Sequence, residues 1–364
     1  MKILVGLSGG VDSSTVACIL KEQGHEVIGA TMSIWDKNGA YNLMGQKNKG
    51  CFSPHEEEDV KAARALCQKL DIPYYVIDCT EQYQKIVLDN FKHEYLSGRT
   101  PNPCVICNAF IKFEVLPRSA AVEGIAFDKF ATGHYARLSY NGQTARWQLR
   151  RAADEKKDQS YFLYRLQQEQ LAKIMLPLGE YTKDEVRDIA RKYGIAVSDK
   201  PDSQDFYTSD INDILQTTPH PGNFVNAAGK ILGKHRGIWN YTVGQRRGLG
   251  ISADRPLYVI RLDKEKNEVV LGYEDECCKP SLIAEDINWL SVPPLTAPAT
   301  VKVRLRSSQT PAEAELLPLS GKTAEVRFAV PQKAVAAGQS AVFYDEQGFV
   351  LGGGFIRGEE NGAG

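Results

Sequence analysis

Residues 3–13 read ILVGLSGGVDS, an apolar run that passes into a glycine-rich turn. Val16, Ile19 and Leu20 follow at helical spacing, so the stretch predicts a strand, a tight turn and a helix. Adjacent glycines let the backbone approach an anion, while hydroxyls and the first N–H groups of a helix donate hydrogen bonds to it. The turn therefore predicts a phosphate-binding loop, rather than an ordinary serine-capped turn, made by Gly6, Leu7, Ser8, Gly9, Gly10, Val11, Asp12 and Ser13.

Strands and helices continue to alternate as far as Asp205. Apolar runs predict strands at 27–32, 74–77 and 128–132, and amphipathic patterns predict helices at 53–70, 82–96 and 182–194, the first and last opened by capping boxes at Ser53 and Thr182. This pattern is typical of an α/β fold with a doubly wound parallel sheet, which binds ligands beyond the carboxyl ends of its strands. Gly133 and His134 follow one such strand. His134 either contacts a nucleotide or RNA, or is a structural histidine whose hydrogen bonds are satisfied within the protein.

The pattern becomes β-rich after Asp205. Short runs predict strands at 256–262, 268–271, 300–305, 323–328, 340–344 and 349–355. We therefore expect a small β-barrel or sandwich at the end of the chain.

Composition excludes several classes of protein. The 364 residues are 43% hydrophobic and 24% charged, as in globular domains, and they contain neither a run of 18 apolar residues nor the layout of a signal peptide. We expect a cytoplasmic protein with no membrane segment. A net charge of −1 gives no global sign of nucleic-acid binding, so any RNA site must be a local basic surface.

The eight cysteines are expected to be reduced thiols in such a protein. Cys104 and Cys107 form a Cys-x-x-Cys spacing in a proline-bounded loop, which suits metal ligation or a redox dithiol. We expect core positions for Cys18 and Cys67 in amphipathic helices, leave Cys79 open, and expect a surface role for the pair at 277–278.

Several motifs carry a resemblance to a known family. The first loop lacks the Gly-Lys-Ser/Thr ending of a Walker A motif and resembles the Ser-Gly-Gly-x-Asp-Ser loop of the N-type ATP pyrophosphatases. Further motifs resemble the bacterial tRNA-specific 2-thiouridylase family: GRTPNP at 98–103 with CN at 107–108, ATGHY at 131–135, KDQSYFL at 157–163, TVGQRRGLG at 242–250 and GQSAVFY at 338–344. The resemblance implies an ATP pyrophosphatase-loop domain at 1–205, a central domain at 206–280 and a C-terminal β-barrel at 281–364.

This resemblance also implies a reaction. ATP would adenylate O2 of the wobble uridine in tRNA, and sulfur carried as a cysteine persulfide would then displace AMP. Asp12 would help to hold Mg²⁺, and Met32 would line the adenine pocket with Gly133, although Met32 suits plain core packing equally. The partners implied are tRNAs for Lys, Glu and Gln, and a sulfur donor, either a cysteine desulfurase, another persulfide carrier or free sulfide.

The tRNA-contacting residues are likewise taken from the resemblance. The RNA-binding candidates are Asn102, Pro103, Cys104, His134, Lys157, Asp158, Gln159, Arg246, Arg247, Arg304 and Arg306. Ser307 and Ser308 disturb the spacing of the family's arginine-rich stretch, so Arg304 and Arg306 are the weakest matches.

The sequence departs from the family at two positions. Cys104 follows Pro103 where the family's best-known form has Asp, and Tyr207 stands where its second catalytic cysteine is expected. Two hypotheses for the sulfur step follow. Either Cys104 and Cys107 form a persulfide–disulfide relay, or they ligate an iron–sulfur cluster such as [4Fe-4S] with Cys51 as third ligand, leaving one iron position open.

Two other functions compete with tRNA thiolation. A related ligase or amidotransferase would adenylate a carboxylate, but it would need neither the Cys-x-x-Cys nor the tRNA-matching stretches. A non-catalytic RNA-binding or sulfur-carrier scaffold would fit Tyr207, but the intact nucleotide loop argues against it.

Overall fold

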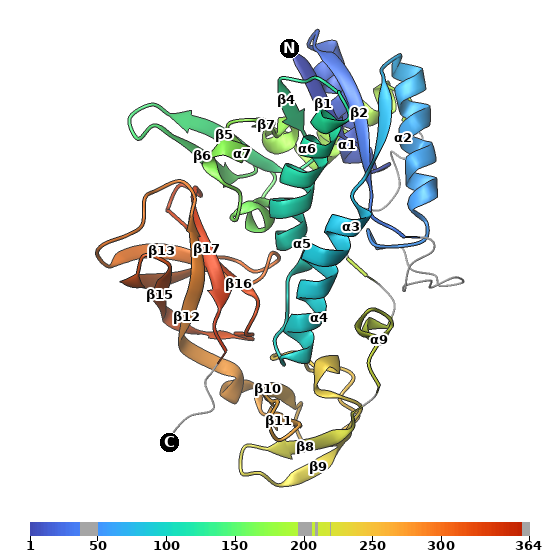
Figure 1. Ribbon diagram of the computed structural model, residues 1–364. Coiled ribbons are helices and arrows are strands. Elements are labelled where there is room, and N and C mark those ends of the chain that lie inside the picture. The colour runs from blue at the N-terminus through green and yellow to red at the C-terminus, as the bar shows by residue number, and fades with distance from the viewer. Residues whose placement is uncertain (37–49, 196–205, 208–209, 219, 359–364) are drawn as a thin grey trace. The chain divides into compact units, whose positions relative to one another are not determined.

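The computed structural model describes residues 1–36, 50–195, 206–207, 210–218 and 220–358 (Figure 1). The chain divides into two compact units. The first comprises residues 1–88, 103–214 and 348–350, and the second comprises residues 89–102, 215–347 and 351–364. No described helix is both long enough and apolar enough to span a lipid bilayer.

A five-stranded parallel sheet forms the centre of the first unit, in the order β3-β2-β1-β4-β7. Its strands are β1 (Lys2–Gly6), β2 (Glu26–Ser33), β3 (Tyr74–Asp78), β4 (Lys129–Ala131) and β7 (Ile174–Met175). The chain order reverses between β1 and β4, which makes the carboxyl ends of these two strands the topological switch point of the sheet.

Helices cover both faces of this sheet, which confirms the doubly wound α/β prediction. One core joins alternate residues of β1 to α1 (Val11–Glu22), α2 (Glu56–Leu70) and α8 (Lys183–Lys192). Ala131 of β4 belongs to that core, whereas its neighbour Phe130 contacts the ring of Phe113 at 5.9 Å. Because neighbouring strand residues point to opposite faces, Phe113 packs on the other side.

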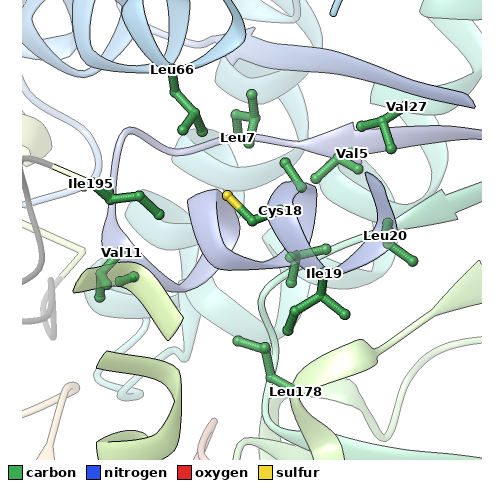
Figure 2. Close-up of a cluster of buried hydrophobic side chains, with 14 of the residues drawn as sticks. Val5, Leu7, Val11, Cys18, Ile19, Leu20, Val27, Leu66, Leu178 and Ile195 are labelled. Carbon is green, nitrogen blue, oxygen red and sulfur yellow. The ribbon is translucent and has the colours of Figure 1, made fainter. Parts of the chain in front are cut away.

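The apolar core explains two of the cysteines. Cys18 lies on α1 with its sulfur among aliphatic side chains, as Figure 2 shows, and Cys67 of α2 belongs to the same cluster. Burial raises the pKa of both thiols, to about 11 for Cys18 and about 12 for Cys67. The prediction that these two residues fill core positions is confirmed.

The two predicted capping boxes had different outcomes. Thr182 caps α8 and accepts a hydrogen bond from the backbone N–H of Glu185, whose side chain accepts from the N–H of Thr182 at 2.7 Å. The prediction of a capping box at Ser53 was wrong, because α2 begins only at Glu56. Before it lies a turn in which the Ser53 hydroxyl accepts a hydrogen bond from the N–H of His55.

Helical segments with wide turns follow β3 and precede β4. The first runs through α3 (Thr80–Tyr83) and the π-helical segment η1 (Gln84–Leu88). The second runs through α5 (Pro103–Ile106), the π-helical segment η2 (Cys107–Val115) and α6 (Leu116–Val122). The prediction of a proline-bounded loop at Cys104 and Cys107 was therefore wrong: Pro103 opens a helix that carries both thiols.

The remaining elements of the first unit are short. A hairpin follows β4, short helices and turns connect it to α8, and a further short helix follows α8 in the chain. These elements are β5 (Ala136–Asn141), β6 (Arg146–Arg151), η3 (Ser160–Leu163), α7 (Gln168–Leu171), η4 (Pro177–Glu180) and α9 (Ile211–Leu215), whose last residue falls in the second unit.

The second unit contains a four-stranded sheet in the order β10-β11-β8-β9 and a closed barrel in the order β12-β15-β14-β13-β16-β17. The sheet strands are β8 (Gly222–Asn226), β9 (Ile231–His235), β10 (Tyr258–Asp263) and β11 (Glu268–Gly272). The barrel strands are β12 (Cys278–Trp289), β13 (Ala299–Arg304), β14 (Ala312–Ser320), β15 (Thr323–Lys333), β16 (Ser340–Tyr344) and β17 (Val350–Ile356).

The closed barrel confirms the barrel expected from the family resemblance. Short helices α4 (Asp89–Leu96), η5 (Ile238–Asn240) and η6 (Glu274–Cys277) complete the unit. Cys277 is buried at the end of η6, so the expected surface role was wrong for this residue, whereas Cys278 is half-buried at the start of β12.

Candidate functional site

The loop between β1 and α1 requires glycine at its first turn. Gly9 has φ +68°, and a Cβ atom there would lie 2.7 Å from the Cα and carbonyl oxygen of Asp59. Any side chain would therefore be strained by its backbone angle and would also collide with α2. The loop is shaped by close backbone approach, as the sequence predicts.

Serine hydroxyls fold this loop onto itself. The backbone N–H of Ser8 donates to Oγ of Ser13 at 3.1 Å, and the two serine hydroxyls lie 3.2 Å apart. Gly10 occupies the N-cap of α1, which receives no hydrogen bond from a capping side chain. The first N–H groups of α1 are thus positioned to bind an anion such as phosphate.

The other nucleotide candidates lie at the ends of adjacent strands. Gly133 follows β4, and a Cβ atom there would lie 2.8 Å from the backbone nitrogen of Ser13, so this residue packs directly against the loop. Met32 is half-buried near the end of β2, the strand that pairs with β1 on its other side. The switch point therefore brings together segments that are far apart in sequence.

Asp12 is held by a lysine that the sequence interpretation did not select. Nζ of Lys183 lies 2.7 and 2.9 Å from the two carboxylate oxygens of Asp12, and the hydroxyl of Tyr135 donates to the same carboxylate at 2.9 Å. Lys183 is only 5% exposed and occupies the first position of α8, where the helix dipole disfavours a cation. That unfavourable placement was the available signal of a functional role.

His134 is neutral at physiological pH. Its Nδ1 lies 2.8 Å from the hydroxyl of Thr132, and its ring is 5.4 Å from that of Phe113. Burial and the positive charge of Lys112 lower the pKa of His134 to about 3. A neutral imidazole next to Gly133 can donate and accept hydrogen bonds, but it supplies no positive charge to an RNA phosphate.

The 157–159 stretch is tied to the same centre. The carboxylate of Asp158 is buried and accepts hydrogen bonds from the backbone N–H groups of Ala152 and Ser160. Gln159 accepts through Oε1 from the N–H of Tyr135, whose hydroxyl reaches Asp12. Asp158 thus orders the stretch, while Lys157 is partly exposed.

Cys104 and Cys107 occupy one helical turn, since residues three apart lie on the same face of a helix. Cys104 is half-buried and Cys107 is buried, 7% exposed. Burial raises the pKa of the Cys107 thiol to about 12, although Lys112 acts in the opposite direction. At neutral pH Cys107 is therefore protonated, and as a thiol it is a poor nucleophile.

Lys112 is the cation of the cysteine region. Burial by itself lowers its pKa, but the thiol groups of Cys107, Cys51 and Cys104 outweigh burial and raise it. All three sulfur atoms therefore lie within electrostatic reach of one ammonium group, although they come from two separate segments.

Cys51 contacts the segment that contains Tyr207. Its Sγ lies 3.8 Å from the carbonyl oxygen of Phe206, which also accepts a hydrogen bond from the N–H of Phe52 at 3.2 Å. The side chain of Cys51 is exposed, yet enough protein surrounds it that desolvation raises the pKa of its thiol. The hydroxyl of Tyr207 donates to Asp213 at 2.9 Å.

Within the described part of the chain, no group of three or more His, Cys, Asp and Glu side chains is arranged to hold a metal ion. Cys51, Cys104 and Cys107 are all described, so their thiols share an electrostatic environment without forming a ligand set. These residues do not fit an iron–sulfur cluster in this arrangement.

The second unit contains the arginine candidates. Arg246 and Arg247 are exposed. Arg306 donates at 3.3 Å to the carbonyl of Val243, which belongs to the same loop as these two arginines. Arg304 is buried instead: its guanidinium donates to the carbonyls of residues 307 and 309 and lies over the ring of Tyr344. The guanidinium of Arg304 therefore makes its hydrogen bonds within the second unit, and the contact of Arg304 with tRNA stays a prediction.

Asn102 follows a loop that the barrel unit holds in place. Nε2 of Gln339 donates to the carbonyls of Thr100 and Pro101 at 2.9 and 3.1 Å. Asn102 itself is partly exposed, and Pro103 begins α5.

Family models match three successive parts of the chain. Family models match the tRNA methyl transferase HUP domain at residues 1–207, the tRNA methyl transferase PRC-barrel domain at 210–273 and the aminomethyltransferase beta-barrel domain at 279–356. Among solved structures, NMN synthetase from Francisella tularensis is similar at a TM-score of 0.34 and 17% identity over 56% of this chain and 66% of that one.

Full-length relatives are much more similar. The tRNA-specific 2-thiouridylase MnmA of Endomicrobium trichonymphae is 48% identical over 98% of this chain and 99% of its own length. The protein of the same name from Acetivibrio thermocellus is 47% identical over the same shares. The chain belongs to the tRNA-specific 2-thiouridylase family.

Proposed function

We propose that this protein is an ATP-dependent tRNA-uridine 2-sulfurtransferase, which replaces O2 of the wobble uridine by sulfur. The observation that carries this function is the presence, in one compact unit, of a phosphate-binding loop and of a helical segment that carries two thiols and a half-buried lysine. The names of the full-length relatives support it. The methyl-transfer names of the family models give no role to either feature.

The first half of the reaction activates the uridine. ATP binds with its β and γ phosphates on the Ser8–Ser13 loop, and O2 of the uridine attacks the α phosphorus, so that pyrophosphate leaves. Mg²⁺ typically uses one or two carboxylates together with substrate phosphates. Asp12 fits this role, because its side chain is 27% exposed and its orientation is fixed by Lys183.

The second half delivers sulfur. A persulfide sulfur attacks C2 of the adenylated uridine, and AMP leaves with the former O2. AMP is a good leaving group, whereas an unactivated carbonyl oxygen is a poor one, which explains why ATP is needed. Because Cys51, Cys104 and Cys107 form no metal-ligand set, no step is assigned to an iron–sulfur cluster, and we assign sulfur transfer to thiols. A cysteine desulfurase or another persulfide carrier supplies the sulfur.

The candidate residues for tRNA binding occur in each of the two units. Gln159 binds the backbone of Tyr135, whose hydroxyl donates to Asp12, and His134 and Lys157 are close to these residues in sequence. Asn102 precedes the helix that begins at Pro103. Arg246, Arg247 and Arg306 supply local positive charge in the second unit, as phosphate contacts require. The tRNAs for Lys, Glu and Gln are the expected substrates, and the cytoplasm is the expected place of the reaction.

Turnover of ATP to AMP with unmodified tRNA tests the function, together with nucleoside mass spectrometry for 2-thiouridine. Wild-type protein with a persulfide donor should form both products. Cys107→Ser should form AMP but no 2-thiouridine, because the loop is untouched while the thiol chemistry is lost. No AMP formation indicates a scaffold, and AMP formation that depends on a small carboxylic acid instead of tRNA indicates a ligase.

A further inference from the structure

Sulfur from an external donor must first reach a thiol that the donor can approach. Thiol–disulfide exchange depends on access as well as on reactivity. Cys107 is 7% exposed, Cys104 is half-buried, and Cys51 is exposed. Of these three thiols, Cys51 is the one most open to a persulfide carrier.

Cys51 shares the electrostatic environment of the other two thiols. Lys112 and Tyr83 each interact electrostatically with Cys51, Cys104 and Cys107. These interactions link the 50–52 segment to the helix at 103–115. Geometry agrees, because Phe52 stacks on Tyr83 of α3 and α3 packs against the helical segment that begins at Cys107, so the three thiols lie in one region of the unit.

Tyr83 supplies a second and independent sign that this site receives a ligand. Its side chain is 1% exposed, and within the described part of the chain its hydroxyl has no hydrogen-bond partner. Its ring stacks on Phe52, the neighbour of Cys51, with centroids 5.7 Å apart. A buried hydroxyl without a partner costs about 1–3 kcal/mol, so the Tyr83 hydroxyl is expected to bind a group at this site that the protein itself does not supply.

Local contacts fix the position of Cys51. A Cβ atom at Gly50 would lie 2.5 Å from the carbonyl oxygen of Phe206, and both Phe52 and Cys51 contact that same oxygen. Cys51 is thereby held against the residue that precedes Tyr207. Thus a thiol lies beside the position where the family resemblance led us to expect a second cysteine.

We infer that Cys51 is the sulfur-accepting thiol of this enzyme and that the Cys104–Cys107 pair resolves the sulfur it carries. The inference rests on the proposed thiolation of tRNA. Tyr83 acts as a positioning residue, whose hydroxyl donates a hydrogen bond to the sulfur anion formed at this site, and Lys112 balances the charge of that anion.

Each step balances in atoms and electrons. The Cys51 thiolate attacks the outer sulfur of a donor persulfide, so the donor leaves as a thiolate and Cys51 becomes a persulfide. The terminal sulfur, as its anion, attacks C2 of the adenylated uridine and AMP leaves. A thiolate of the Cys104–Cys107 pair then attacks Sγ of Cys51, which forms a protein disulfide and leaves the uridine as its 2-thiocarbonyl. A dithiol reductant restores the thiols.

The experiment uses full-length protein and glutathione persulfide as the sulfur donor. Sulfur loading without ATP is mapped by alkylation and peptide mass spectrometry, and a single turnover with ATP and tRNA is mapped under non-reducing conditions. Cys51→Ser is compared with Cys278→Ser, a half-buried thiol of the other unit. AMP formation is measured in parallel, and its absence from wild-type protein would overturn the proposed function itself.

The inference predicts that wild type carries the added sulfur on Cys51 and that one turnover links Cys51 to Cys104 or Cys107. Cys51→Ser should keep AMP formation and lose 2-thiouridine formation by at least about 100-fold, whereas Cys278→Ser should behave as wild type. Sulfur loading on Cys104 or Cys107 with wild-type thiolation in Cys51→Ser, or a Cys104–Cys107 disulfide after turnover, would overturn it.

Discussion

The nucleotide loop and the cysteine region of the same unit are built in different ways. The loop consists of residues 8–13, whose serines hydrogen bond to one another, and in the described part of the chain distant residues bind it only through the side chain of Asp12. The cysteine region is assembled from the 50–52 segment, α3 and the helix at 103–115, which share electrostatic contacts but few hydrogen bonds.

This difference matters for function. A preorganised loop binds phosphates with little rearrangement, so its donors are already paired or aimed when ATP arrives. The cysteine region instead holds a protonated thiol in Cys107 and a buried hydroxyl in Tyr83 without a described partner. In the mechanism inferred above, a sulfur anion supplies the hydrogen-bond partner that the Tyr83 hydroxyl lacks.

The largest expected effect tests whether the loop depends on a residue outside it. Lys183→Met removes the cation that holds Asp12 and should lower tRNA-dependent AMP formation by about 100- to 1000-fold, as loss of a preorganised charge in an active site does. Lys192→Met, on the exposed side of the same helix, serves as control. Wild-type rates in Lys183→Met would show that the loop acts alone.

The next effect tests packing at the switch point. Gly133→Ala places a Cβ atom 2.8 Å from the backbone nitrogen of Ser13, which cannot move without disturbing α1. We expect a loss of about 1–3 kcal/mol in the free energy of unfolding and a higher KM for ATP. Gly142→Ala meets no atom within 4 Å and should change neither quantity. An unchanged KM for ATP in Gly133→Ala would show that Gly133 does not belong to the nucleotide site.

A third change addresses the cysteine region. Tyr83→Phe removes a buried hydroxyl that lacks a described partner, so the free energy of unfolding should stay the same or rise by up to about 1 kcal/mol. Thiolation should slow by about 10-fold, the value of one lost hydrogen bond to an anion, while AMP formation stays unchanged. Equal loss of both activities would mean that Tyr83 serves only the fold.

The smallest effect concerns pH. The pKa of His134 is about 3 in the folded protein and about 6.5 in an unfolded chain. The unfolded state binds more protons between these values, so stability is complete above about pH 6.5 and falls as the pH drops toward 3, by about 1 kcal/mol at pH 5.5. Acid titration of unfolding should therefore show a weaker loss in His134→Asn than in wild type. The exposed His93→Asn variant should retain the wild-type loss.

Local sequence patterns predicted the loop well because its geometry depends on neighbouring residues. Gly9 needs its positive φ whatever surrounds it, and Thr182 and Glu185 find each other within one helical turn. The same reasoning failed at Ser53, where a suitable capping pattern is followed by a turn and the helix begins three residues later.

The cysteine region could not be predicted in this way. Cys104-x-x-Cys107 looked like a loop motif between prolines, but Pro103 starts a helix. Nothing in the sequence near Cys51 indicates that Phe206 lies beside it, because that contact joins residues 155 positions apart. Tyr83 was overlooked for the same reason, because its significance comes from the groups around it, whereas Lys183 offered one sequence signal, a cation at the first position of a helix.

The sequence by itself determined the α/β class, the phosphate loop and the family, because these depend on short patterns that repeat wherever the fold occurs. The tertiary structure decided that Lys183 holds Asp12, that Arg304 is buried in the barrel and that Cys51 joins the other thiols at Lys112. Burial and charge act through space, so whether a thiol is a filler like Cys18 or part of a reactive site depends on its three-dimensional neighbours.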